Sequence, residues 1–367
     1  MKTIKLKPAN LLYNIFVFML VFAFLGVNIA YSVPAGLATG VALGFITSPQ
    51  VVLWAAIQKD IWQNHIEENL YKDNAFLSTF VQVDKSYIDG RNVHIPQAGA
   101  ASAVKKNRTT LPAEVKQRTD TPTSYQINEF TSDPILIPNA DTHELSYDKR
   151  NSVLREDSAK LAEEVAEDVL LSMVKAAIGT TTALPAGNIL STTGDAVAAT
   201  APGATGNRKA YKLGDLQRAQ SFFIRKKLWT EGRMYAIITG EAAAQMFPAE
   251  SQVTATYMAA VSEAERRGGI MYSAYGFKIM VRSTVFVLDN TGAFKPLSAE
   301  GAATDNEGIV FYNGNCMEFA MGDVKFFEKT DDPTYYGDVY SFLVRCGARA
   351  RRENFDGVMV IKQAATA

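Results

Sequence analysis

The sequence predicts an α+β fold, because helical and strand-like patterns occupy separate stretches of the chain rather than alternating along it. One long amphipathic helix is indicated over residues 146–178, where apolar residues recur at helical spacing. Short alternating runs typical of strands lie before it, at 81–96 and 125–130, and again after residue 276. The chain has 367 residues, 47 % of them hydrophobic, which allows a sizeable core and excludes a disordered or fibrous protein.

Charge and cysteine content narrow the class of protein further. The 37 basic residues nearly balance the 38 acidic ones, so the chain is not built as a general polyanion binder. The two cysteines, Cys316 and Cys346, exclude a disulfide scaffold and favour a reducing compartment. Each lies in a strand-like run, so we interpret both as small buried side chains. With three histidines, a histidine-rich metal site is not expected.

The chain begins with an uncharged leader. Residues 8–58 contain no Asp, Glu, Lys, Arg or His, and lysines precede them. Within this window, residues 11–30 are rich in Phe, Leu and Val and are long enough, as a helix, to cross a bilayer core of roughly 30 Å. Three interpretations stay open: a membrane anchor or signal peptide, a hydrophobic arm packed on a partner subunit, and a leader that is processed or used only in assembly.

After the leader, residues 51–71 predict an amphipathic helix that faces either its own core or a partner. Strand patterns then flank residues 97–122, a polar and basic stretch without hydrophobic periodicity. A loop of this length is unusual inside a compact domain and is usually functional or disordered. We therefore expect one long β-hairpin over 86–131 with a projecting tip, because the tip has too few apolar residues to fold onto the body.

The long helix at 146–178 carries its acidic residues mostly opposite its apolar face. Residues 179–210, rich in Gly, Ala, Thr, Ser and Pro, are typical of a linker or mobile loop, and a second compact unit begins near Tyr211. Asn313–Gly314 predicts a hairpin turn between strand runs at 310–312 and 316–319. The other expected elements are helices at 215–228, 239–247 (with Thr239 as N-cap) and 254–266, and strands at 235–238, 276–281, 285–288, 339–345 and 358–361.

Motifs that carry catalysis are absent from the sequence. HExxH, CxxC and GxSxG do not occur, and GATGNRK at 203–209 lacks the Gly-Lys-Ser/Thr ending of a phosphate loop. His94 and His143 have no second ligand at metal-binding spacing. The acidic cluster around Glu163 and Asp168 is most simply a solvated helix face. We expect no enzyme activity, no cofactor and no metal site.

The order of parts is more informative than any motif: apolar arm, projecting basic hairpin, long helix, flexible segment, compact α+β unit. This order resembles the major capsid protein of tailed bacteriophages, the Hong Kong ninety-seven-type capsid fold. DTHELSYDKR at 141–150 is similar to the entry into the family's spine helix, and YGFKI at 275–279 to a strand of its axial domain. Gly337-Asp338 followed by strands at 339–348 and 358–361 resembles the closing strands of its peripheral domain. The uncharged leader departs from the family pattern.

The resemblance implies a division of the chain into six parts. They are an uncharged hydrophobic leader (1–50), an N-terminal arm (51–85), an extended hairpin loop (86–131), a peripheral domain with the spine helix (132–180), an axial domain (181–324) and peripheral return strands (325–367). In the family the extended loop lies over a neighbouring subunit, and the axial domain packs around five- and six-fold axes. The same arrangement is expected here.

The resemblance implies a structural, non-enzymatic protein that self-assembles, through hexamers and pentamers, into the icosahedral shell around double-stranded viral DNA. Expected partners are further copies of the chain, scaffold, portal and decoration proteins, and DNA bound on the inner face without sequence specificity. The expected localisation is the virion, after assembly in the host cytoplasm. The expected inter-subunit contacts use charged residues of the hairpin and the long helix: Lys105, Lys106, Arg108, Arg118, Asp120, Glu163, Glu164 and Glu167.

A second hypothesis is a membrane-anchored or exported binding protein that uses residues 11–30 as anchor or signal. Retention in carbonate-washed membranes, or a mature N-terminus near residue 31 without particles, would favour it. A hydrolase with an unrecognised site is the third hypothesis, and no constellation of residues supports it.

Overall fold

The structure is a computed structural model that describes residues 74–97, 104, 106–109, 112, 115, 117, 121–138, 149–175, 184–352 and 354–366. The chain divides into two units, Met1–Asn64 and His65–Ala367, and every described residue belongs to the second. The predicted leader, with its anchor or signal segment at 11–30, and the predicted helix at 51–71 lie outside the described residues. Within the described part, no helix is long and apolar enough to cross a membrane.

The first sheet is built around two long antiparallel strands, β16 (Met317–Asp332) and β17 (Gly337–Ala350). β1 (Val81–Gln82) pairs with the other edge of β16, whereas β5 (Asn128–Thr131) and β6 (Ile135–Pro138) pair with β17. Burial alternates along β17, because successive side chains of a strand point to opposite faces. The sheet therefore has one covered face and one more open face.

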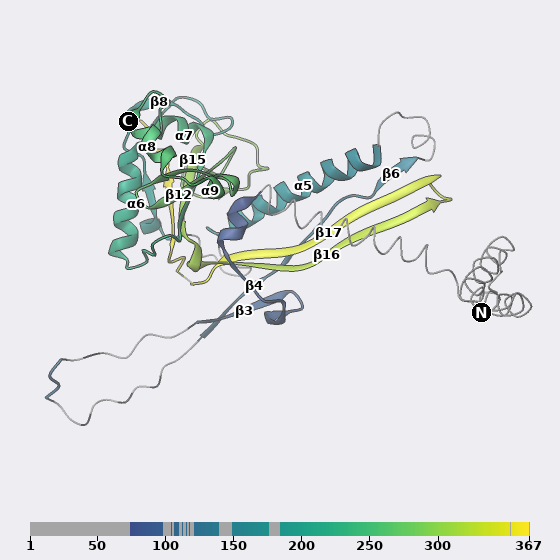
Figure 1. The fold of residues 1–367 in the computed structure, drawn as a ribbon, viewed down its shortest axis with the longest axis horizontal. Coiled ribbons are helices and arrows are strands. Elements are labelled where there is room, and N and C mark those ends of the chain that lie inside the picture. Colours follow the sequence, from purple (N-terminus) through teal and green to yellow (C-terminus); the bar gives the residue numbers. More distant parts are fainter. Residues whose placement is uncertain are drawn as a thin grey trace, which may run out of the picture. The chain divides into compact units, whose positions relative to one another are not determined.

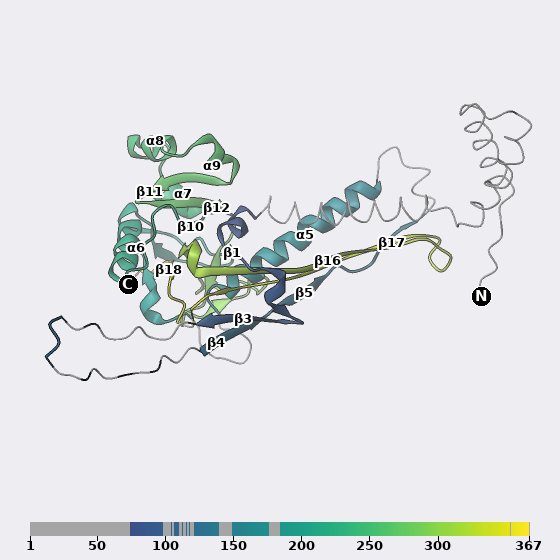
Figure 2. The same ribbon diagram turned by 60° about the horizontal axis from the view of Figure 1, so that its bottom comes forward.

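Helix α5 (Lys149–Ser172) covers one face of the first sheet, beside β17 (Figures 1 and 2). It forms where apolar residues recur at helical spacing, as the sequence predicts, and at 1.5 Å per residue its 24 residues span about 36 Å. The apolar stripe is buried against the sheet: Leu154, Leu161, Val165, Val169, Leu170 and Met173.

The second sheet has eight strands in the order β11–β12–β10–β15–β13–β14, with β18 beside β15 and β7 beside β18. Central β10 pairs parallel with β12 and antiparallel with β15. The bounds are β7 Ile189–Ser191, β10 Met234–Thr239, β11 Ile270–Ala274, β12 Phe277–Arg282, β13 Phe286–Leu288, β14 Phe294–Lys295, β15 Asn306–Asn313 and β18 Val358–Lys362.

The main core lies between the second sheet and two helices, α6 (Leu213–Arg225) and α7 (Gly240–Met246). Phe277 sits at its centre, with ring contacts of 6.0 Å to Phe223 of α6 and 5.2 Å to Phe311 of β15. Thr239 accepts a hydrogen bond from the Ala242 amide and caps α7, which confirms the predicted helix start. Two further helices pack beside β11: α8 Gln252–Ala259 and α9 Glu263–Arg267.

The remaining strands form two small sheets, β2–β3–β4 and β8–β9. Their bounds, with those of the 3-10 helices, are β2 Ile88–Asp89, β3 Asn92–Gln97, β4 Thr121–Gln126, β8 Ala196–Ala198, β9 Asn207–Lys209, η1 Ala75–Thr79, η2 Lys85–Tyr87, η3 Ala186–Asn188 and η4 Gly314–Cys316.

The hairpin predicted at Asn313–Gly314 is wrong. β15 and β16 belong to different sheets, and η4 links them. The Asn313 side-chain Nδ2 donates to the Leu228 carbonyl at 2.7 Å, and the Gly314 backbone N donates to the Arg233 carbonyl at 2.9 Å. These non-local bonds direct the chain from one sheet to the other instead of reversing it.

Two further expectations need correction. Residues 184–210 are not a linker throughout, because β7 pairs with β18 and β8 with β9. Their small residues allow close backbone approach: a Cβ on Gly194 would lie 2.3 Å from the Ala210 carbonyl oxygen. The strand at 358–361 does form, but it pairs with β15 in the second sheet rather than joining the strands at 339–348.

Two predicted elements are also divided. The helix predicted at 254–266 breaks between α8 and α9, where Ser262 and Glu265 form a capping box. The returning hairpin strand predicted at 125–130 ends at Gln126, and the next residues enter the first sheet as β5.

Candidate functional site

The base of the hairpin is anchored on the first sheet. Strands β3 and β4 pair antiparallel, as predicted, and their buried side chains Val93, Ile95 and Tyr125 pack with Ala320 of β16. The Tyr125 hydroxyl donates to Oε1 of Glu318 at 3.5 Å, and burial beside this carboxylate raises the pKa of Tyr125. The base is therefore a fixed part of the fold.

The loop between β3 and β4 is described at only some of its residues. Among its described residues, Val104 and Val115 are 95 % and 96 % exposed, and Lys106 and Arg108 are exposed too. The other predicted contact residues of the loop lie outside the described residues: Lys105, Arg118 and Asp120. The described part thus presents both apolar and cationic side chains to solvent.

The hairpin and α5 lie on opposite faces of the first sheet (Figures 1 and 2). Cys346 of β17 is buried on the α5 side of the sheet. Burial chiefly raises its pKa, and the negative charge of Asp168 on α5 adds to this effect. Its neighbour Gly347 points the other way, and a Cβ there would lie 3.0 Å from the Gln126 carbonyl oxygen of β4. We call the side that carries the hairpin base the hairpin face.

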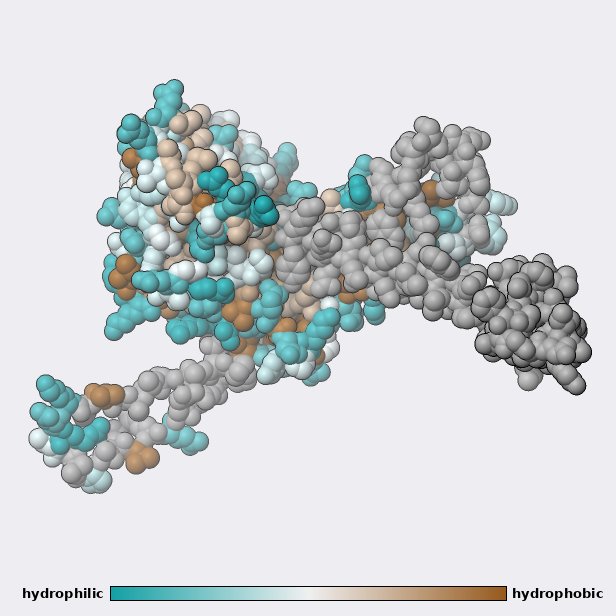
Figure 3. Space-filling model, viewed as in Figure 1, coloured by the Kyte–Doolittle hydropathy of each residue, from teal (hydrophilic) through white to brown (hydrophobic). Residues whose placement is uncertain are grey.

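An apolar stripe continues along the hairpin face, away from the hairpin base. We define it by Leu136, Phe327, Val339 and Leu343, which the strand pairings place on one face. Phe327 is 48 % exposed and Leu136 is 40 % exposed. Figure 3 shows hydrophobic side chains gathered at the near end of the stripe, where the hairpin base meets the first sheet.

Charges beside the stripe are already paired within the chain. Lys329 contacts Asp332 at 2.7 Å, and Arg345 contacts Glu129 at 2.7 Å. Lys325, which pairs with Leu343 on the same face, lies 4.0 Å from Asp323, and both side chains are exposed. The stripe therefore offers a partner an apolar surface with charged side chains at its edges.

The predicted acidic residues lie on α5. Glu163 and Glu164 are exposed, and Glu167 is half-buried. Burial and the neighbouring Glu164 raise the pKa of Glu167, which Arg282 of β12 partly offsets. One cation that the acidic cluster faces therefore belongs to its own chain.

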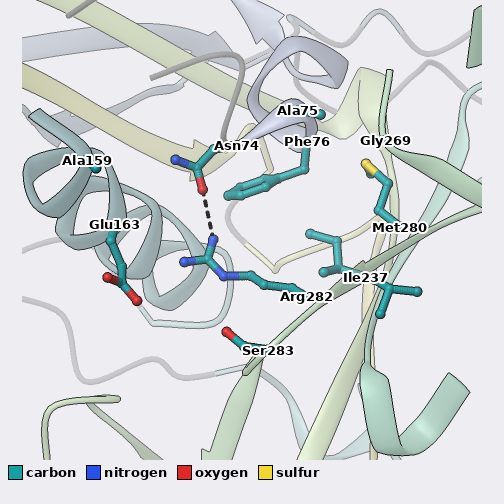
Figure 4. Close-up of a pocket in the computed structure, with 11 residues that line it drawn as sticks. Asn74, Ala75, Phe76, Ala159, Glu163, Ile237, Gly269, Met280, Arg282 and Ser283 are labelled. Atoms are coloured by element: carbon teal, nitrogen blue, oxygen red, sulfur yellow. Dashed lines mark hydrogen bonds between the residues drawn. The ribbon is translucent and has the colours of Figure 1, made fainter. Parts of the chain in front are cut away.

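Arg282 lies in a pocket of about 400 Å³ where α5, η1 and β12 meet (Figure 4). Its Nη1 donates to Oδ1 of Asn74 at 3.1 Å, while Asn74 Nδ2 donates to the Ala162 carbonyl of α5 at 3.0 Å. Glu163 lies across the pocket from the guanidinium (Figure 4). Burial lowers the pKa of Arg282, which Glu167 and Glu163 offset. Asn74 thus joins the helix of the first sheet to a strand of the second.

Asn74, Arg282 and the apolar stripe are functional features that the sequence did not predict. Asn74 and Arg282 stand 208 positions apart, so no local pattern relates them. The stripe had a weak signal in the alternation around Phe327. The two cysteine thiols are free, with Cys346 buried and Cys316 half-buried.

Within the described part of the chain, no three or more His, Cys, Asp or Glu side chains gather as a metal site would require. The pocket at Arg282 holds one guanidinium and one exposed carboxylate, together with apolar and small polar groups. This arrangement ties elements together, and we assign no reaction to it.

No family model and no curated protein matches the sequence. The capsid of Ralstonia phage GP4 matches with a TM-score of 0.57 and 11 % identity, over 79 % of this chain and 88 % of that chain. The capsid of cyanophage P-SCSP1u matches with a TM-score of 0.54 and 16 % identity, over 79 % and 87 %. The capsid of cyanophage Pam1 gives 0.53 and 10 %, over 78 % and 88 %.

The chain has the tailed-phage capsid fold. The match confirms the predicted α+β class and the capsid resemblance at the level of fold. In this capsid fold the observed parts include the anchored hairpin, the long helix over the first sheet and the second, eight-stranded sheet.

Proposed function

We propose that this chain is a structural shell protein whose copies assemble, as hexamers and pentamers, into an icosahedral capsid around double-stranded viral DNA. The capsid fold supports this proposal. The observation that carries it is a hairpin with a fixed base and a loop whose described residues are exposed. Ordering such a loop costs conformational entropy, and burial against another copy offsets that cost.

The partners follow from this role. Each copy contacts several others, and scaffold, portal and decoration proteins meet the assembled shell. Packaged DNA contacts the inner face without sequence specificity, which the near-zero formal charge of −1 favours by limiting repulsion. The protein resides in the virion after assembly in the host cytoplasm, and it acts without catalysis.

We propose the hairpin face as a surface that receives a neighbour's hairpin. The predicted contact between loop cations and Glu163, Glu164 and Glu167 stays a prediction. The structure favours the apolar stripe, because it lies on the same side of the sheet as the hairpin of its own chain. The exposed Val104 and Val115 of another copy supply apolar side chains of matching chemistry.

The test uses purified full-length protein, examined by negative-stain microscopy and analytical ultracentrifugation. Wild-type protein is expected to form rings or closed particles. Replacing residues 100–118 by a short Gly/Ser linker should leave folded subunits, judged by circular dichroism and thermal unfolding, that do not assemble.

A matched pair of variants separates loop chemistry from loop length. Lys106→Arg with Arg108→Lys keeps both charges and should assemble, whereas Val104→Asp with Val115→Asp should not. Normal particles from the loop replacement would contradict the role of the hairpin. A wild-type protein that stays monomeric at all concentrations would contradict the shell function.

A further inference from the structure

A buried carboxyl group in the second sheet has no part in the proposed assembly contacts. Glu307 lies on β15 and is 5 % exposed. Its backbone carbonyl accepts hydrogen bonds from the Tyr211 hydroxyl at 3.0 Å and from the backbone N–H of Gln363 at 2.9 Å. The residue thus sits where the start of α6, the central sheet and the C-terminal segment meet.

The Glu307 side chain belongs to a three-residue hydrogen-bond chain. The Thr200 hydroxyl lies between Oε2 of Glu307 and Oε1 of Gln363, 3.1 Å from the latter. A hydroxyl has one proton and can donate it along only one of these two directions. The Gln363 amide nitrogen, buried with the rest of its side chain, has no hydrogen-bond partner in this arrangement.

The charges around Glu307 do not compensate an ionised carboxylate. No ion pair joins it to a cation of the described chain, and the charged neighbour on α7 is Glu241, of like sign. On β9, Arg208 is buried nearby but donates to Asn306 Oδ1 and to backbone carbonyls. The Thr239 hydroxyl of β10 also bonds the carboxyl group. Burial chiefly, with Glu241, raises the pKa of Glu307 to about 7.

We propose that Glu307, Thr200 and Gln363 form a proton-operated latch that fastens the β8–β9 hairpin and the C-terminal segment to the second sheet. In the closed state Glu307 is protonated and donates to Thr200, whose hydroxyl donates to Gln363 Oε1. When the carboxyl proton passes to solvent, Thr200 must donate to the carboxylate instead. Gln363 then keeps a bond only by turning its amide nitrogen toward Thr200.

The ionised state leaves a buried carboxylate without a cation, which favours opening of the elements around it. Further hydrogen bonds also join these elements: Arg208 of β9 donates to Asn306 and to the Ala303 and Asp305 carbonyls, and the Ala364 amide donates to the Thr192 hydroxyl oxygen. Lys209 N donates to the Ala364 carbonyl at 2.9 Å, and the Thr366 hydroxyl donates to the Asn207 carbonyl at 3.0 Å. The amides of Lys209 and Gln363 therefore report whether the latch is closed.

The test is hydrogen exchange of purified full-length subunits, corrected for the intrinsic effect of pH. A carboxyl group with a raised pKa in the closed state favours closure at low pH, and this advantage is lost as pH rises through the closed-state value. With values of about 7 closed and 4.5 open, the opening equilibrium should rise about tenfold between pH 6 and 8.5 at the Lys209 and Gln363 amides. The Phe311 amide of the core strand should not change.

Glu307→Gln cannot ionise and should make this exchange independent of pH. Glu241→Gln removes a like charge but keeps the latch, so its opening midpoint should move to lower pH. Infrared spectroscopy at pH 6 should show a protonated carboxyl band that Glu307→Gln lacks. Wild-type exchange that is flat from pH 6 to 8.5, or an unchanged midpoint in Glu241→Gln, would overturn the latch. Neither readout requires assembly, so these outcomes are independent of the shell function.

Discussion

Truncating Phe327 should weaken the association of subunits, because its side chain lies on the surface that we propose to contact a neighbour. The side chain is 48 % exposed at the centre of the apolar stripe. An aromatic side chain has about 200 Å² to bury, so roughly 100 Å² is left for a partner to cover. At about 25 cal/mol per Å², this area contributes at most ~2.5 kcal/mol per contact, or about 70-fold in the association constant.

The assay is the critical concentration for particle formation, followed by light scattering. Phe327→Ala should raise it by up to about 70-fold. Because the buried half of the ring is lost as well, subunit unfolding must be measured separately by denaturant titration. Ile224→Ala is the matched control, since Ile224 is 54 % exposed on α6, outside the stripe. An unchanged critical concentration for Phe327→Ala, or an equal change for Ile224→Ala, would refute the assignment of the hairpin face.

Three further predictions concern the subunit itself. Asn74→Ala should lower the free energy of unfolding by about 2–4 kcal/mol, because one bond to a charged group and one neutral bond are lost; an Asn74→Asp variant that is equally unstable would contradict the role of its acceptor oxygen. Gly194→Ala should lower the free energy of unfolding by about 1–3 kcal/mol, because its Cβ would lie 2.3 Å from a backbone oxygen. Gly187→Ala has open space around its Cβ and should leave the free energy of unfolding nearly unchanged. A thiol reagent should label Cys316 before Cys346 in folded protein, because Cys346 is buried whereas Cys316 is half-buried, although burial raises the pKa of both thiols; equal rates would contradict this difference in burial.

Local patterns predicted elements whose stability is largely local or whose apolar face is wide. Helix α5 and the start of α7, capped by Thr239, are examples, because helical periodicity and a capping residue can be recognised in a short stretch of sequence. The same reasoning predicted the pairing of the strands on either side of the hairpin loop. In each case the residues that determine the structure are neighbours in sequence.

The errors arose where a distant partner decides the conformation. Asn313–Gly314 has the composition of a hairpin turn, but its polar groups bond Leu228 and Arg233, so the chain crosses between sheets. The segment containing β7 was predicted as a linker because small residues resemble one, although β18 gives it a strand to pair with. The exposure of the described loop residues was predictable from the polar, basic composition of the loop. The proposed acceptor stripe was not predictable, because facing positions on β6, β16 and β17 come from three parts of the chain.

The arrangement of the hairpin face also determines what kind of assembly the proposed contact can build. The hairpin base of one copy already occupies the end of this face at Ala320, so a neighbour's loop can use only the stripe beyond it. In the proposed contact, the loop of each copy binds the stripe of one neighbour, and its own stripe binds the loop of another. The two surfaces differ, so the contact is heterologous. Heterologous contacts do not stop at a pair, because the second copy still offers a free loop and the first a free stripe. Repetition therefore closes rings or extends a lattice, and a protein that stopped at symmetric dimers would contradict this contact.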